Sequence, residues 1–145
     1  MEEMNKPWVS LYPPEIPKEI NLQERTLQSF LKEAAGEYPN KVAIHFLGKK
    51  LTFKELYEQS LKFANYLKDL GVSKGDRVAI MLPNCPQAVI GYYGTLFAGG
   101  IVVQTNPLYT ERELEYQVND SGAEVILTLD ILFPPRADPY TGTMG

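Results

Sequence analysis

Residues 77–104 read RVAIMLPNCPQAVIGYYGTLFAGGIVVQ, and the fold class follows from this stretch. It opens with an apolar run of strand length, continues with a segment of helix length and closes on a second apolar run. No charged residue occurs from Val78 to Thr110. The prolines and glycines that interrupt the stretch exclude a membrane-spanning helix. We therefore predict strand, helix and strand in the middle of an α/β sheet that is covered on both faces.

Prolines and glycines set the ends of these three elements. Pro83 stops the first strand. Pro86 suits the first turn of the helix, because its missing N–H has no intrahelical partner there. Asn84 is expected to cap that helix, and Gly99-Gly100 to end it in a left-handed conformation. The predicted elements are a strand at 77–82, a helix at 85–98 that is buried on all sides, and a strand at 101–104.

Two further helices are marked by capping boxes, in which a threonine is followed three residues later by a glutamate. These pairs are Thr52 with Glu55 and Thr110 with Glu113. The remaining predictions are a helix from Thr26 to about Tyr38, a helix from Thr52 to Gly71, a helix from Thr110 to about Gly122, a hairpin of strands at 42–46 and 50–51, and a buried strand at 124–129. From residue 76 onward the order is β-α-β-α-β, which predicts parallel strands joined by right-handed crossovers. The predicted fold class is α/β, a mostly parallel sheet with helices on both faces.

Composition excludes several classes of function. With 145 residues, 44% hydrophobic and 22% charged, the chain suits one globular domain with a core of its own. Its net charge of −4 gives no basic surface for nucleic acid. The single cysteine, Cys85, fits a reducing compartment, and we expect a cytoplasmic location. Residues 1–20 hold no apolar run of the kind found in a secretory signal.

Residues 1–21 are polar and rich in proline. They predict an extended N-terminal arm that lies over the surface and is anchored by Trp8 and Tyr12. A frayed terminus is the alternative.

Few residues in the predicted domain point to chemistry. The loop at 82–86 lacks glycine, and its prolines remove amide donors that a phosphate would need, so we expect no phosphate site there. Gly99-Gly100 follows a helix and precedes a strand, whereas a phosphate loop has the reverse order. Both features are therefore expected to be structural.

The remaining reactive side chains have no evident partners. His45 is expected at a strand edge facing solvent rather than in catalysis, because no nucleophile or carboxylate can be nominated beside it. Cys85 is expected to be a small buried thiol rather than a nucleophile. Tyr92-Tyr93 and Phe97 are expected in the core, with the lining of an acyl pocket as the alternative. No set of His, Cys or carboxylate residues has the spacing of metal ligands.

Four segments, taken in this order and spacing, resemble the adenylate-forming (acyl-activating) enzymes. They are LTFKEL at 51–56, KGDRVA at 74–79, Pro83-Asn84, and the run from Ala98-Gly99-Gly100 to Asn106-Pro107. A fifth segment, PLYTEREL at 107–114, is similar to the long-chain fatty acid–CoA ligases of bacteria. The resemblance divides the chain into an arm at 1–21, part of the N-terminal domain of an acyl–CoA ligase at 22–134, and an irregular tail at 135–145.

This resemblance implies an activity for the whole enzyme. Such enzymes use ATP and Mg²⁺ to turn a fatty acid into an acyl-adenylate, and then form a thioester with coenzyme A. The sequence lacks the Pro-Lys-Gly of their phosphate loop and their adenine-side motif, so we assign no catalytic residue and expect the chain alone to be inactive. A free-standing fragment that binds or dimerises without catalysis is the alternative. The sequence is compatible with a homo-oligomer and with peripheral membrane contact, and it does not determine which acyl chain length the whole enzyme prefers.

The tail resembles the start of the family's phosphate loop. Thr141, Gly142 and Thr143 are the candidate cofactor-binding residues on this resemblance. Met144 breaks the pattern, and the lysine that would stabilise triphosphate charge is missing. A truncation scar, an internally deleted gene product or an added tail are the preferred interpretations of residues 136–145.

Overall fold

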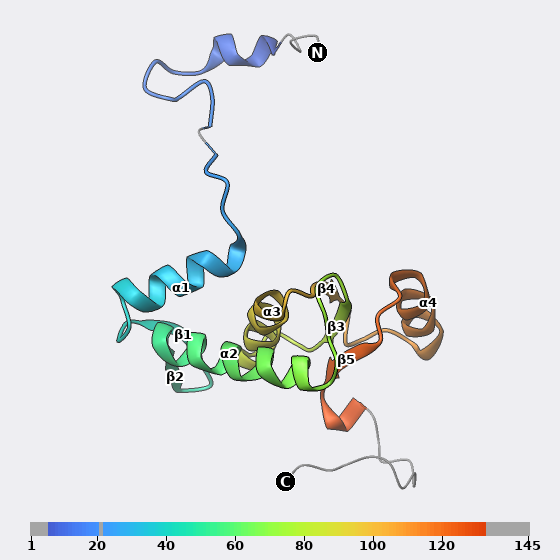
Figure 1. The fold of residues 1–145 in the computed structure, drawn as a ribbon. Helices are drawn as coiled ribbons and strands as arrows, with labels where there is room; N and C mark the ends of the chain where they lie inside the picture. The colour runs from blue at the N-terminus through green and yellow to red at the C-terminus, as the bar shows by residue number, and fades with distance from the viewer. Residues whose placement is uncertain (1–5, 21, 133–145) are drawn as a thin grey trace, which may run out of the picture.

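The computed structural model describes residues 6–20 and 22–132 (Figure 1). The helices are α1 (Leu27–Glu37), α2 (Phe53–Asp69), α3 (Pro86–Ala98) and α4 (Glu111–Ser121), with short 3-10 helices at Pro7–Leu11 and Asp130–Leu132. The strands are β1 (Val42–Phe46), β2 (Lys49–Thr52), β3 (Arg77–Met81), β4 (Ile101–Gln104) and β5 (Val125–Thr128). Each helix and strand predicted from the sequence from residue 26 onward is present, with ends that differ by one or two residues.

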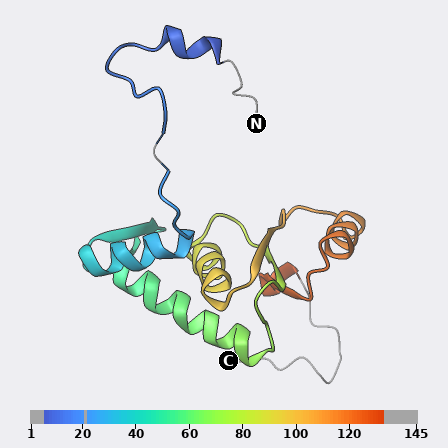
Figure 2. The ribbon, with the colours of Figure 1, turned by 45° about the horizontal axis from the view of Figure 1, so that its top comes forward.

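A parallel sheet in the order β4-β3-β5 forms the centre of the fold. Val78 of β3 lies opposite Val102 of β4 and Val125 of β5. The chain moves in one direction from β3 to β4 and in the opposite direction from β4 to β5. Right-handed crossovers then require α3 and α4 to lie on opposite faces of the sheet, as Figures 1 and 2 show. The predicted α/β class is confirmed.

Burial is concentrated on the central strand. Val78, Ala79, Ile80 and Met81 are all buried, whereas β4 and β5 are only partly buried and Ile101 is 51% exposed. No residue of α4 is buried, so this helix leaves part of the neighbouring sheet face open. The prediction of a sheet covered on both faces is therefore correct for β3 and wrong for β4 and β5. The prediction that the strand at 124–129 is buried is also wrong, because this strand is only partly buried.

The layer formed by α2 and α3 depends on small residues. Gly94 of α3 faces the backbone oxygen of Ser60 and the ring of Phe63, with no room for a side chain. Ser60 and Thr95 are buried, and their hydroxyls donate to carbonyls one turn earlier, Leu56 O and Gly91 O, each at 2.8 Å. These internal bonds satisfy polar groups that would otherwise be costly between two helices.

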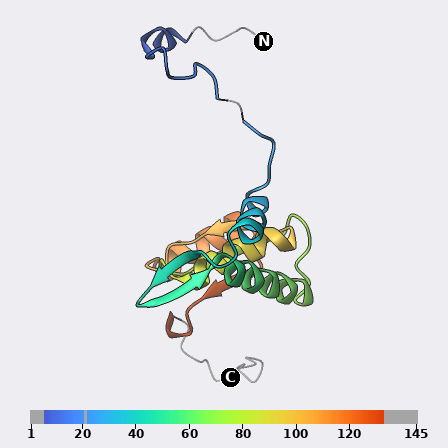
Figure 3. The ribbon, with the colours of Figure 1, turned by 90° about the vertical axis from the view of Figure 1, so that its left-hand side faces the viewer.

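The hairpin of β1 and β2 stands beside these helices (Figure 3). Its turn places both Leu47 and Gly48 at positive φ, 48° and 79°, as a two-residue hairpin turn of type I′ requires. Together with α1, which packs on α2 and α3, the hairpin completes the predicted packing around the β-α-β-α-β unit.

At the starts of the helices, two of the predicted caps are confirmed and a third is wrong. Both predicted capping boxes are formed, at Thr52 and at Thr110. The prediction that Asn84 caps α3 is wrong, because Cys85 occupies the N-cap position and its side chain makes no capping bond. Pro86 is the first helical residue, where its fixed φ fits, and this places the cap one residue after Asn84. Thr26 is at the N-cap position of α1, but its side chain does not cap the helix.

The described part of the N-terminal arm, residues 6–20, lies away from the helices and the sheet (Figures 1 and 3). Trp8 is 52% exposed and Tyr12 40% exposed. The prediction that these aromatic side chains anchor the arm on the surface is therefore wrong. The arm includes a 3-10 helix at Pro7–Leu11, which was not predicted from the sequence.

Candidate functional site

Two of the segments that carry the family resemblance meet at the amino end of the parallel sheet. The Gly75 N–H donates to Gly99 O at 3.0 Å, and the Ile101 N–H donates to Asp76 O at 2.7 Å. Gly75 and Gly99 both have positive φ, 92° and 89°. Hydrogen bonds thus join the turn before β3 to the turn that ends α3. The predicted structural role of Gly99-Gly100 is confirmed.

Arg77 extends this junction to the far side of the sheet. Its guanidinium donates to the backbone carbonyls of Gly75, Ser121 and Gly122 at 3.2, 3.1 and 3.0 Å. The last two carbonyls end α4, where a positive charge also interacts favourably with the helix dipole. This role was not predicted from the sequence, where Arg77 entered only as part of a resembling segment. The one feature of the sequence that could have indicated this role is the position of Arg77, a single charged residue at the start of an apolar strand.

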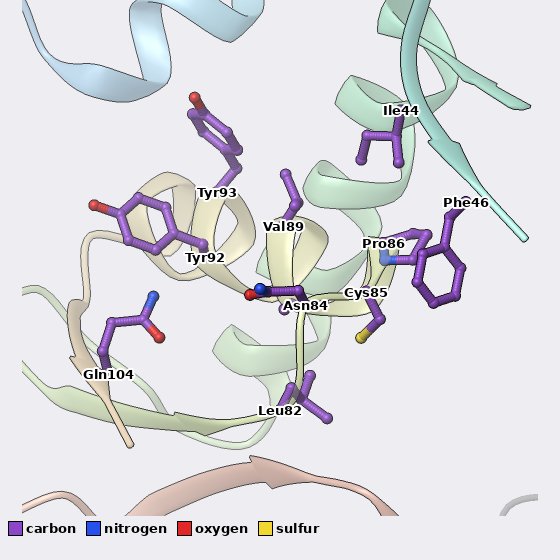
Figure 4. Close-up of a pocket in the computed structure, with 11 residues that line it drawn as sticks. Ile44, Phe46, Leu82, Asn84, Cys85, Pro86, Val89, Tyr92, Tyr93 and Gln104 are labelled. Atoms are coloured by element: carbon purple, nitrogen blue, oxygen red, sulfur yellow. The ribbon is translucent and has the colours of Figure 1, made fainter. Parts of the chain in front are cut away.

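A hollow of about 370 Å³ lies at the opposite, carboxyl end of the sheet (Figure 4). It is bounded by the loop from β3 to α3, by the outer face of α3, by the end of β4 and by β1. The lining side chains are Ile44, Phe46, Leu82, Asn84, Cys85, Pro86, Ala88, Val89, Tyr92, Tyr93 and Gln104. All eleven are uncharged, and nine of them belong to the charge-free stretch at 78–110.

The lining of the hollow includes a residue that was considered for chemistry in the sequence. Cys85 is half-buried and lines the hollow, so the prediction of a buried thiol is wrong. The reason is its N-cap position, which lies in the loop rather than inside the helix.

The aromatic residues of α3 divide between two environments. Tyr92 and Tyr93 line the hollow with ring centroids 5.8 Å apart, at a steep angle to one another. Phe97 instead packs edge-on against Tyr57, with centroids 5.5 Å apart. The predicted core position is therefore correct for Phe97, whereas the two tyrosines line a hollow.

The other candidate residues contribute no chemistry in the described residues. His45 is exposed on β1, as predicted. Thr141, Gly142 and Thr143, the proposed remnant of a phosphate loop, lie outside the described residues. A second hollow, between Arg77 and Glu124, measures only about 60 Å³, and the Arg77 guanidinium already donates to three carbonyls.

The described residues do not form a site suited to a nucleoside triphosphate and its metal ion. The first residue of α3 is Pro86, which has no N–H to offer a phosphate at the helix end beside the hollow. Within residues 6–20 and 22–132, no group of three or more His, Cys, Asp or Glu could hold a metal ion. We therefore derive no catalytic step from this part of the chain.

Comparison with known proteins identifies the family. A family model described as AMP-binding enzyme matches residues 31–143. The chain belongs to the AMP-binding enzyme family. Both the junction at the amino end of the sheet and the hollow at its carboxyl end lie within the matched range.

Members of the AMP-binding family with curated functions include very similar sequences. A long-chain-fatty-acid–CoA ligase of Bacillus subtilis (strain 168) is 60% identical over 132 residues, which cover 91% of this chain and 24% of the relative. The ligase of the same description from Salmonella typhimurium is 47% identical over 126 residues, 86% of this chain and 22% of the relative. The chain thus spans about a quarter of the length of these relatives.

Solved structures of AMP-binding family members have the same fold. The N-terminal subdomain of NpsA from Klebsiella oxytoca has a TM-score of 0.72 and 27% identity, covering 79% of this chain and 30% of that structure. O-succinylbenzoate coenzyme A synthetase from Bacillus subtilis, solved in complex with AMP, has a TM-score of 0.66 and 30% identity, covering 68% and 26%. No helix in the described residues of our chain is long and apolar enough to cross a membrane.

Proposed function

We propose that this chain is part of an ATP-dependent long-chain fatty acid–CoA ligase. The observation that carries the proposal is the 60% identity to the Bacillus subtilis ligase over 91% of the chain. The proposed substrates of the whole enzyme are a fatty acid, ATP with Mg²⁺, and coenzyme A. The activity for which the relatives are named supports the fatty acid and coenzyme A, and the AMP complex of a structural neighbour supports the nucleotide. A cytoplasmic location is proposed on the single cysteine.

The role proposed for this part of the enzyme is structural. Arg77 and the glycines of the resembling segments form hydrogen bonds with backbone groups at the amino end of the sheet. They fix the spacing of the sheet and its two covering helices, on which a site built from further residues depends.

A chimeric ligase tests the proposal. The matched segment of the Bacillus subtilis enzyme is replaced by residues 1–132 of this chain, and palmitoyl-CoA formation is measured with ATP, Mg²⁺ and palmitate. We expect activity above that of a chimera carrying Gly94→Trp, because that substitution forces α2 and α3 apart. A soluble, monodisperse chimera with a cooperative melt and no palmitoyl-CoA formation contradicts the proposal.

The isolated chain is expected to be inactive in the same assay. Pyrophosphate release with ATP, Mg²⁺ and palmitate should equal that of a blank without protein, because the described residues hold neither a phosphate loop nor a metal site. Release that is abolished by deleting residues 136–145 would instead identify Thr141, Gly142 and Thr143 as a working phosphate loop.

A further inference from the structure

We propose that the hollow at the carboxyl end of the parallel sheet is a binding site for a small, uncharged aromatic molecule that carries an amide. The proposal goes beyond the ligase function and does not depend on it. The site is lined by Asn84, Gln104 and the two tyrosines of α3, opposite Ile44 and Phe46 of β1. Its volume of about 370 Å³ lies within the range of small-molecule sites, on the order of 300–1,000 Å³.

The topology of the sheet places the hollow where ligands bind in open α/β sheets. Parallel strands β3 and β4 are neighbours, but the chain leaves them toward opposite faces, to α3 and to α4 (Figures 1 and 2). A crevice forms at the carboxyl ends of strands that diverge in this way, and ligands in such folds occupy it. Leu82 and Asn84 follow β3, and Gln104 ends β4, so the lining comes from both sides of this divergence.

The absence of charge among the lining residues selects an uncharged ligand. No Asp, Glu, Lys, Arg or His lines the hollow. A carboxylate or phosphate placed there would lose part of its hydration without gaining a partner of opposite charge, which is costly. The uncharged lining therefore separates this site from the fatty acid carboxylate and the nucleotide of the proposed ligase.

Two primary amides select a polar group on the ligand. The side chains of Asn84 and Gln104 face the hollow, near the ring of Tyr92 (Figure 4). The Gln104 carbonyl on the backbone accepts a bond from Gln117 Nε2 at 2.9 Å. Both side-chain amides are exposed at the mouth of the hollow, and neither has a protein hydrogen-bond partner in residues 6–20 and 22–132. Each primary amide both donates and accepts, so an amide on the ligand can pair with either one.

Aromatic walls select a flat ligand body. Tyr92 and Tyr93 stand nearly perpendicular to each other on one side, and Phe46 lies on the other (Figure 4). A flat ring can meet such walls by stacking and by edge-to-face contact. A flexible alkyl chain would gain only apolar contact and would form no hydrogen bond with either amide.

The thiol of Cys85 provides the readout. It is half-buried, lines the hollow and is the single cysteine of the chain. The rate of its alkylation by iodoacetamide is measured by mass spectrometry with benzamide and with benzoate, which have nearly the same shape but differ in charge. We expect benzamide to slow alkylation with half-protection at about 1 mM, as suits so small a ligand. Benzoate is expected to protect at least about tenfold more weakly, because its charge has no partner.

Two variants assign the effect to the hollow. Asn84→Leu keeps the size of the side chain and removes the amide, and should weaken benzamide protection about fivefold. Gln87→Leu changes an exposed residue of α3 that does not line the hollow, and should leave protection unchanged. The fold of each variant is checked by its thermal melt.

Four results would overturn the proposal. Equal protection by benzamide and benzoate would show that the uncharged lining does not select the ligand. Protection by 1-octanol but not by benzamide would show a site for alkyl chains. Loss of protection in Gln87→Leu, or none with benzamide in the parent chain, would show that the hollow is not the site. None of these outcomes depends on ATP or coenzyme A, so they leave the ligase proposal unaffected.

Discussion

At the scale of single residues, close packing between α2 and α3 depends on Gly94. A Cβ at this position would lie 2.7 Å from Phe63 Cδ1 and 2.9 Å from the Ser60 backbone oxygen. We predict that Gly94→Ala lowers the free energy of unfolding by about 1–3 kcal/mol, because the backbone of α2 must move.

Gly36→Ala is the matched control for this substitution. Gly36 lies near the end of α1, and a methyl group added to its Cα would have nothing within 4 Å. Alanine there should raise the free energy of unfolding, by up to about 1 kcal/mol, because glycine is the poorer helix former. Urea titrations of both variants give the comparison, and equal effects would show that α2 and α3 are not in close contact.

Arg77 is the second residue on which the fold depends. It donates to three carbonyls from two turns, and lysine cannot reproduce this planar set of donors. Both Arg77→Lys and Arg77→Ala should lower the free energy of unfolding, the latter by about 2 kcal/mol. Arg112→Ala, at an exposed arginine of α4, should change it by less than about 0.5 kcal/mol. A full recovery of stability in Arg77→Lys would show that charge alone suffices.

At the scale of elements, the chain offers a comparison of two threonine caps. Thr52 Oγ1 accepts from the Glu55 N–H at 3.2 Å, whereas Thr26 holds the same position on α1 without a side-chain bond. We predict that Thr52→Ala lowers the free energy of unfolding by about 1 kcal/mol and Thr26→Ala by clearly less. Equal losses, measured by thermal melts, would mean that the capping bond contributes nothing.

The same capping box predicts a dependence on pH. The backbone N–H of Thr52, and then its hydroxyl, donate to the Glu55 carboxylate and lower the pKa of Glu55. A lowered pKa in the folded state gives stability that is present above the unfolded pKa and is lost as pH falls through the folded pKa. Glu55→Gln should therefore reduce the loss of stability on acidification. The free energy of unfolding is measured by denaturant titration at several acidic pH values. An equal loss of stability on acidification in Glu55→Gln and the parent chain would contradict this prediction.

At the scale of the whole molecule, exposed apolar side chains dominate the expected behaviour. They occur on the arm and around the sheet, at Leu11, Ile16, Ile20, Leu22, Ile101, Leu108, Tyr116 and Ile131. We predict that the chain binds a hydrophobic dye and self-associates more than a well-covered domain of its size. Sedimentation and dye fluorescence test this, and removal of residues 1–21 separates the arm's contribution from that of the body. A compact monomer without dye binding would contradict the prediction.

Most of the fold could be predicted from the sequence because its signals are local. Pro83, Pro86 and Gly99 set the ends of β3 and α3, and the threonine–glutamate pairs set the starts of α2 and α4. Alternation of strands and helices then fixed the parallel sheet and its handedness. The cap of α3 was misplaced by one residue because Asn84 and Cys85 both precede Pro86, and the spacing of residues alone does not distinguish them.

The candidate site depended on contacts that no local pattern shows. The sequence by itself determined that residues 78–110, which supply nine of the eleven residues lining the hollow, carry no charge. Only the tertiary structure decided that Asn84, Gln104 and Tyr92 share that hollow, and that Arg77 joins β3 to the end of α4, 45 residues away from it at Gly122. These contacts join residues far apart in the chain. They arise because parallel strands bring the ends of separate crossovers to the same end of the sheet.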